Sequence, residues 1–360
     1  MGTSTGGTSS SGKGGTASTK GGGGSATSAS DDTAIELNSG AEALVDVFVA
    51  KAGVFVVTTQ SVTLFDRSGK ILEQQIAPRA ITAAAFDDEL LVVADAAKLT
   101  SYDLDLKQLI SSNLLEGCVS SVLLSEHRFV CGPKNDWDRI FYTYDATTGE
   151  LLASSKKYTY KGIPMRRIPG KDDFVTVSVD SSPSDFHLYS LLATSEAGFV
   201  NESPYHGDFR VTGVYAFDGT PPTHLVTDAG LLLHIYGEEC DVDHNSFTSG
   251  CFTKDGALGT LTGDQVFAGM DGDAAGKLYA LVSTSRSFSD PQCSDGCLLQ
   301  QVDIASRSVD KQVTVHPSFG KLVVLRHDAV GGSIVLGVSN AGKTGAARDT
   351  SGYRVLTYPI

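Results

Sequence analysis

The sequence predicts an all-β fold that is built from repeated small sheets. From residue 31 onward, short runs of β-type residues alternate with turns of Gly, Asp, Asn and Ser, and long helical periodicity is scarce. One segment form recurs along the chain: an apolar run that ends in an aromatic residue and Asp, followed by a turn. With 41% hydrophobic residues, the chain can bury a core for such a fold.

The recurring segment occurs seven times. Its anchor residues are Phe65, Tyr102, Tyr144, Tyr189, Tyr236, Val302 and Tyr358. The first four steps between anchors match the roughly 40–50 residues of a four-stranded propeller blade, and the two longer steps contain insertions at 238–251 and 283–296. Two further β-type runs precede each anchor. The repeats therefore predict a seven-bladed β-propeller over residues 33–360, with a pair of β-sandwiches as the competing fold.

The two ends of the chain are expected to meet in the last blade. Tyr358 lies almost at the C-terminus, so the seventh blade lacks its outer strand. The apolar segment Ala34–Leu37 precedes the first blade and is predicted to supply that strand. Such an exchange would cover two exposed sheet edges at once.

These repeats resemble the seven-bladed propellers of the WD-repeat, YVTN-repeat and quinoprotein-like superfamily. The resemblance implies that ligands meet the face formed by loops entering each inner strand and by loops joining the second and third strands. The candidate binding residues in the first class of loops are Arg79, Arg166, Arg167, His206 and Arg210, and Trp137 is the candidate in the second class. The arginines are expected to attract an anionic ligand. Alternatively, they are solvated loop charges, and Trp137 packs at the start of a strand.

The first 32 residues are predicted to be a disordered tether ahead of the propeller domain. Residues 1–30 contain 10 Gly, 8 Ser and 6 Thr, which cannot bury enough apolar area to offset their ordering entropy. The segment shows no basic and apolar leader, and the chain has no apolar run of membrane-spanning length. Membrane attachment is therefore expected only through an N-terminal anchor that has been removed.

The cysteines indicate an oxidising compartment. Six occur, and they read as three local pairs: Cys118–Cys131, Cys240–Cys251 and Cys293–Cys297. The alternative is six unpaired thiols in a cytosolic protein. A Gly/Ser/Thr tether ahead of a disulfide-bonded domain resembles a bacterial surface lipoprotein, which implies a periplasmic, cell-surface or extracellular location.

Composition and motifs exclude some functions and leave others open. A net charge of −14 argues against nucleic-acid binding. Residues 337–344 match the phosphate-binding loop G-x-x-x-x-G-K-[ST], but no helix can follow, so a turn between strands is expected. Asp241, Asp243 and Asn245 form half of a calcium loop, as does the segment 271–276, and turn chemistry is the alternative at both places. Calcium is the one candidate cofactor.

The sequence favours a non-catalytic, extracytoplasmic binding module for a protein or glycan partner. No metalloprotease H-E-x-x-H motif and no G-x-S-x-G nucleophile elbow occurs in the chain. The rival hypothesis is a propeller hydrolase or lactonase-like enzyme that holds a divalent metal in the central channel. The two hypotheses differ in whether a bound metal is expected.

Overall fold

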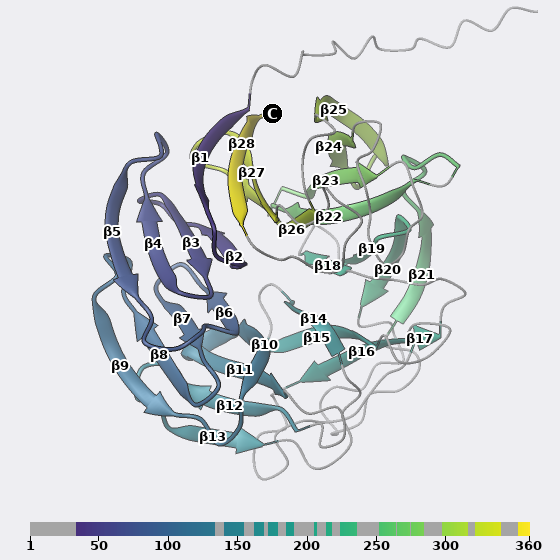
Figure 1. Cartoon of the computed structure of the whole chain (residues 1–360). Coiled ribbons are helices and arrows are strands. Elements are labelled where there is room, and N and C mark those ends of the chain that lie inside the picture. Colours follow the sequence, from purple (N-terminus) through teal and green to yellow (C-terminus); the bar gives the residue numbers. More distant parts are fainter. Residues whose placement is uncertain are drawn as a thin grey trace, which may run out of the picture.

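The computed structural model describes residues 34–133, 140–154, 162–168, 172–178, 185–190, 205–206, 214–217, 224–235, 252–263, 265–273, 275–283, 297–315, 321–339 and 352–360. These residues form seven four-stranded antiparallel sheets and a short 3-10 helix, η2 (Ser125–His127). The sheets are arranged radially, with one edge strand of each nearest the centre (Figure 1).

In six of the sheets the chain runs from the innermost strand to the outermost one. Sheet 1 consists of β2 (Leu44–Val49), β3 (Val54–Thr58), β4 (Ser61–Phe65) and β5 (Ile71–Ile76). Sheet 2 consists of β6 (Ala83–Phe86), β7 (Leu91–Ala94), β8 (Lys98–Tyr102) and β9 (Gln108–Asn113). Sheet 3 consists of β10 (Cys118–Leu123), β11 (Arg128–Pro133), β12 (Tyr142–Asp145) and β13 (Leu151–Ser154). Sheet 4 consists of β14 (Gly162–Arg167), β15 (Asp173–Ser178), β16 (Asp185–Ser190) and β17 (Tyr205–His206). Sheet 5 consists of β18 (Val214–Phe217), β19 (His224–Thr227), β20 (Leu231–Ile235) and β21 (Phe252–Ala257). Sheet 6 consists of β22 (Val266–Gly272), β23 (Lys277–Ser283), β24 (Cys297–Asp303) and β25 (Ser308–Val315).

Sheet 7 joins the two ends of the described chain. Its order from the centre outward is β26 (Lys321–Asp328), β27 (Ser333–Ser339), β28 (Tyr353–Pro359) and β1 (Ile35–Gly40). β1 pairs with β28 from Ile35 opposite Thr357 to Gly40 opposite Tyr353. The closing strand predicted from the sequence is therefore confirmed, as is the β-propeller fold. The predicted tether lies outside the described residues.

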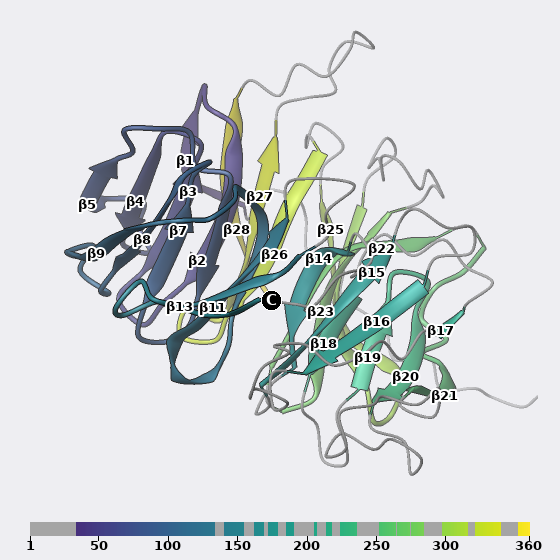
Figure 2. The same cartoon turned by 90° about the horizontal axis from the view of Figure 1, so that it is seen from below.

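The core lies between neighbouring sheets. Inner strands contact one another in ring order, including β26 with β2 across the closure (Figures 1 and 2). Between sheets 1 and 2, for example, Phe48 and Phe55 pack with Leu91 and Tyr102. Each sheet thus has both faces covered, which explains the nearly continuous apolar runs of strands such as β3 and β7.

The recurring aspartate shapes the turn after the third strand. Asp66 follows β4 directly, and its Oδ1 atom accepts hydrogen bonds from the backbone N–H groups of Ser68 and Lys70. Asp103 and Asp145 make the same kind of turn after Tyr102 and Tyr144. The pairing register shifts next to these anchors, so the motif encodes a bulge and a tight turn into the outer strand.

An ion pair also joins the first and last sheets. Arg67, in the turn after β4, donates from Nε and Nη2 to the two carboxylate oxygens of Asp328 at 2.7 and 3.0 Å. Asp328 is buried at the end of β26 and also accepts the N–H groups of Val330 and Gly331. Burial opposes ionisation of Asp328, but these hydrogen bonds outweigh it and hold its pKa below the usual value.

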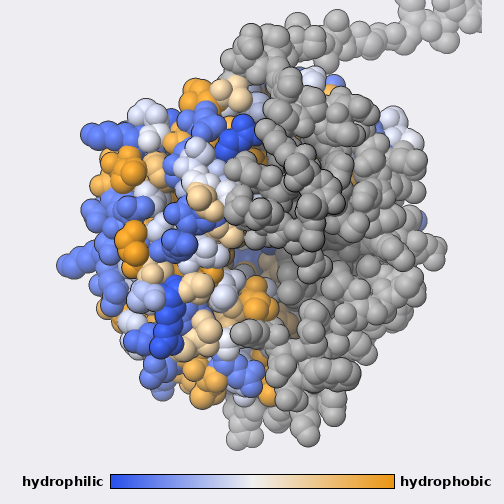
Figure 3. All heavy atoms as spheres, in the orientation of Figure 1, coloured by the Kyte–Doolittle hydropathy of each residue, from blue (hydrophilic) through white to orange (hydrophobic). Residues whose placement is uncertain are grey.

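The outer strands leave apolar side chains exposed. On β5, Ile71, Leu72 and Ile76 are exposed. Leu109 on β9 and Leu152 on β13 are exposed as well. On the coloured part of the face seen in Figure 3, hydrophobic and hydrophilic residues are interspersed. Within the described part of the chain, no helix has the length and apolar character needed to cross a membrane.

Leu37→Ala is expected to lower the free energy of unfolding by about 2–4 kcal/mol, because Leu37 is 5% exposed and packs in the core between sheets 7 and 1. Ile35→Ala is the matched control on the same strand, since Ile35 is 56% exposed and should change stability by less than about 0.5 kcal/mol. Denaturant titration of both variants measures the difference. Equal, small losses would mean that β1 does not hold the ring together.

Candidate functional site

A cavity of about 380 Å³ lies where the ends of the inner strands converge. Its walls include Val49 from the end of β2, Arg167 from the end of β14 and His327 from near the end of β26. Because the C-terminal ends of several inner strands line one cavity, these strands run in the same direction along the central axis. The volume falls in the range of small-molecule and side-chain pockets.

One wall of the cavity carries an ion pair between the last and first sheets. Arg326 of β26 donates from Nη2 to Oδ1 of Asp46 on β2 at 2.9 Å, and its guanidinium lies 5.5 Å from the ring centre of Phe48. Burial raises the pKa of Asp46, although the positive charges of Arg326 and Arg166 act in the opposite direction. The Asp46 side chain is still 23% exposed, because it faces the cavity.

A second carboxylate projects from sheet 6. Asp271 of β22 accepts the backbone N–H of His327 on the neighbouring sheet at 2.7 Å. Burial raises the pKa of Asp271, and the nearby Arg326 charge and the backbone hydrogen bonds only partly offset this effect. The His327 ring stacks on Tyr279 with centroids 3.9 Å apart, and burial lowers the pKa of this imidazole. Burial thus favours the neutral form of the His327 ring.

Two arginines of sheet 4 line the same cavity. The sequence placed Arg166 and Arg167 in a loop that enters an inner strand, and this placement is wrong. They are the last residues of β14, opposite Val175 and Phe174 of β15. Polar side chains are tolerated at this end of the strand because they face the cavity. Arg167 donates from Nη2 to the Ser125 hydroxyl at 3.2 Å, but its Nε is buried without a hydrogen-bond partner among the described residues.

The cavity therefore carries both signs of charge. Asp87 and Asp88, which follow β6, add two more carboxylates to its lining. Asp87 contacts the His127 ring at 3.2 Å. The arginine-lined funnel expected from the sequence is thus balanced by four aspartates, and a ligand would meet both positive and negative groups.

The remaining predicted residues lie apart from the cavity or outside the described residues. Arg79 is exposed in the turn between β5 and β6, before the inner strand begins, so it lies toward the opposite end of the axis. His206 is not in a loop, because it belongs to β17, the outer strand of sheet 4, opposite Asp185. Outside the described residues are Trp137, Arg210, Asp241, Asp243 and Asn245.

One predicted disulfide is confirmed. Cys118 and Cys131 are bonded across β10 and β11, with Cα atoms 5.4 Å apart and both side chains buried. Cys297 is also disulfide-bonded. The predicted pairs Cys240–Cys251 and Cys293–Cys297 include residues that lie outside the described ranges, so they stay predictions.

The phosphate-loop match begins inside a strand. Gly337 to Ser339 end β27, and β28, the next described strand along the chain, pairs with it antiparallel. A Cβ at Gly337 would lie 2.6 Å from the Leu44 side chain and 2.7 Å from that of Val324. This glycine therefore permits close packing between sheets 7 and 1. The residues that would follow in a phosphate loop lie outside the described part of the chain.

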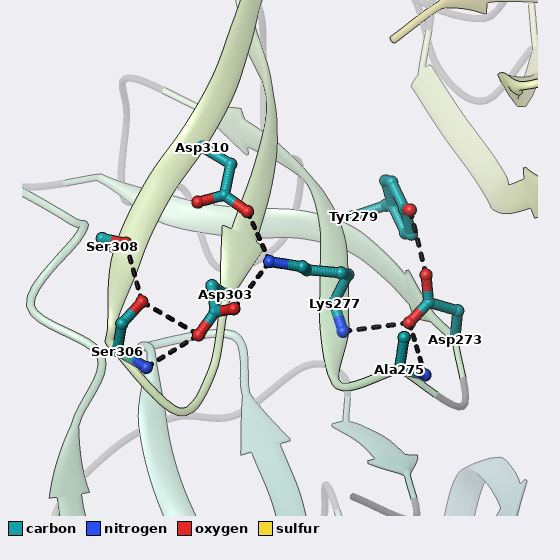
Figure 4. Close-up of polar contacts among 8 residues, drawn as sticks. All are labelled: Asp273, Ala275, Lys277, Tyr279, Asp303, Ser306, Ser308 and Asp310. Carbon is teal, nitrogen blue, oxygen red and sulfur yellow. Dashed lines mark hydrogen bonds and ion pairs between the residues drawn. The ribbon is translucent and has the colours of Figure 1, made fainter. Parts of the chain in front are cut away.

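The second half-calcium segment serves a turn. Asp273 accepts the N–H groups of Ala275 and Lys277 at Oδ1 and the Tyr279 hydroxyl at Oδ2 (Figure 4). Lys277 in turn binds Asp303 and Asp310, at 2.6 Å each, and the Lys277 hydrogen bond lowers the pKa of Asp303 to about 2. Among the described residues, no group of three or more His, Cys, Asp or Glu side chains could hold a metal ion.

Sequence reasoning missed Asp46, Arg326 and His327, and it singled out Asp271 only as part of a half-calcium segment. A signal was present in the sequence. Asp46 interrupts the apolar inner-strand run at 44–49, and Arg326 directly follows the apolar run at 322–325. A charged residue within such a run marks a side chain that faces something other than the core. The pairing of Asp46 with Arg326 could not be read in this way, because 280 residues separate them.

The comparisons with known proteins support the fold class. No protein-family model and no curated protein matches the chain. Among solved structures, the computationally designed Ika8 protein matches with TM-score 0.56 and 11% identity, over 90% of this chain and 98% of its own. U3-55K matches with TM-score 0.57 and 11% identity, over 91% and 99%. The β-propeller domain of Cps50 (Swd1) from Myceliophteria thermophila matches with TM-score 0.55 and 8% identity, over 90% and 99%. The chain is thus a β-propeller, and at these identities the likeness concerns the fold alone.

Asp271→Asn is expected to raise the melting temperature at pH 7. Folding raises the pKa of the Asp271 carboxyl, so the folded state is most stable when this carboxyl is protonated. This stabilisation is lost as the pH rises above the carboxyl's pKa in the unfolded chain, which is about 3.9. The difference from wild type should therefore vanish at about pH 3. The amide oxygen of the introduced asparagine can still accept the His327 N–H, and Asp105→Asn, in an exposed turn, is the matched charge control. A lower melting temperature for Asp271→Asn at pH 7 would contradict this expectation.

Proposed function

We propose that this β-propeller is a non-catalytic binding module that captures a protein partner at the mouth of the central cavity. The observation that supports it is the cavity itself, where charged side chains from separate sheets converge at one end of the axis. Propellers commonly serve as interaction modules, but fold alone does not assign function, so the proposal rests on this site.

The partner is expected to bind through charge and shape together. Arg166 and Arg167 on one side and Asp87 and Asp88 on another offer both donors and acceptors to an incoming loop. Phe48, Phe86 and Met165 provide apolar surface beside them. Such a mixture of apolar surface and desolvated charge is typical of the centre of specific interfaces.

We expect this binding to occur outside the cytoplasm. The Cys118–Cys131 disulfide supports an oxidising compartment, because reduced thiols are the rule in the cytosol. Attachment to a membrane, if any, would come through a segment ahead of the propeller. A periplasmic or cell-surface location follows as part of the proposal.

Arg166→Gln is expected to weaken capture of the partner by about tenfold or more, because a desolvated charged hydrogen bond is lost at the cavity. Arg79→Gln is the matched control, since Arg79 is exposed before β6 and away from the cavity. Crosslinking pull-down from native membranes, followed by titration with the captured protein, measures the effect. Equal capture by both variants would remove the cavity mouth from the interface.

Two further measurements distinguish a protein partner from a glycan partner and a binding module from an enzyme. Binding to a glycan array with no protein captured would replace the protein partner by a glycan. Elemental analysis of the purified protein tests for a divalent metal, and a stoichiometric ion together with chelator-sensitive hydrolysis would favour the rival enzyme.

Thiol titration is expected to find no reactive cysteine in the unfolded, unreduced protein and six after reduction, because all cysteines are predicted to be paired. The purified secreted or periplasmic protein and a cytosolically expressed sample should be compared. Six free thiols in the protein isolated from its native source would overturn the extracytoplasmic location.

A further inference from the structure

The two signs of charge in the cavity come from different parts of the ring. Arg166 and Arg167 belong to sheet 4, and the contacts between neighbouring inner strands place sheet 4 across the ring from the closure of sheets 7 and 1. At that closure Arg326 is already neutralised by Asp46. Besides Asp87 and Asp88 of sheet 2, the carboxylate of Asp271 from sheet 6 then remains in the lining.

The positive side contains an unsatisfied donor. The Arg167 Nε is buried and has no hydrogen-bond partner among the described residues, whereas Nη2 is used by Ser125. A buried N–H without an acceptor costs free energy, and Arg167 lines the cavity. Nε itself is shielded from the cavity, so an anionic ligand group would be attracted by the positive charge of the Arg167 guanidinium that lines it.

The negative side contains an under-compensated carboxylate. The backbone N–H groups of His327 and Gly272 hold the Asp271 side chain, but burial still raises its pKa despite the charge of Arg326. Burial lowers the pKa of the neighbouring His327 ring and so favours its neutral form. A cationic ligand group beside Asp271 would compensate this desolvated charge.

Apolar side chains form a further part of the cavity lining. Phe48, Phe86, Val122, Met165 and Met270 line the cavity there, and about 380 Å³ admits a molecule the size of a small metabolite. We propose that the cavity binds a small zwitterion with an apolar side chain, an amino acid or a dipeptide, with its carboxylate toward Arg167 and its ammonium toward Asp271. This site is additional to capture of a protein at the cavity mouth and does not depend on it.

Isothermal titration calorimetry with L-leucine and with L-leucyl-L-alanine tests the proposal and distinguishes the two sizes of ligand. At least one is expected to bind about tenfold or more tightly than its N-acetylated form and than its C-terminal amide, because each blocked form lacks one charge. Arg167→Gln should abolish the preference for the free carboxylate, and Asp271→Asn should abolish the preference for the free ammonium. Asp105→Asn, which removes the same charge from an exposed turn, should bind like wild type.

The change of preference is the decisive measurement. A variant that merely loosened the fold would weaken all probes alike and would leave the preferences intact. If Arg167→Gln does not fold, Arg167→Lys, which keeps the charge but removes the planar guanidinium, is expected to show a reduced preference for the free carboxylate. Absence of binding by both zwitterions, or equal binding of free and blocked forms, would overturn the proposal, whether or not a protein partner is captured.

Discussion

The structure depends on closing the ring of sheets. Every sheet covers the faces of its two neighbours, so an open ring would expose an apolar face at each end. The chain closes it by returning its first strand to its last sheet, where β1 pairs with β28 and Leu37 packs against sheet 1. The ion pair between Arg67, in the turn after β4, and the buried Asp328 stabilises the same junction. Closure thus combines backbone pairing, apolar burial and one directed ion pair.

The cavity is a consequence of that geometry. Inner strands that run in the same direction bring their final residues to one place, and those side chains cannot all pack in the core. Charged residues occupy this position at Asp46, Arg166, Asp271 and Arg326. Because burying charge is costly unless it is paired, the pair of Asp46 and Arg326 is the arrangement that such a site requires. The less well compensated groups, Arg167 and Asp271, are where a ligand would gain most.

The acidic character of the chain has two separate origins. Asp66, Asp103 and Asp145 use their carboxylates to accept backbone N–H groups in tight turns, so their role is local. Asp46 and Asp271 instead face the cavity and contact neighbouring sheets. Carboxylates of this acidic chain therefore serve turns at some positions and line the cavity at others.

Local patterns along the chain were enough to predict the β-propeller, its strand succession and its closing strand. Anchors such as Phe65 and Tyr102 end the third strand of their sheets, and the aspartate after each makes the turn that the pattern indicates. The same reasoning paired Cys118 with Cys131, which are near in sequence. The site, in contrast, exists only in the folded ring. Arg166 and Arg167 read as loop charges along the chain, and Asp46 and Arg326 read as interruptions, because what they face is set by strands hundreds of residues away that meet only when the ring closes.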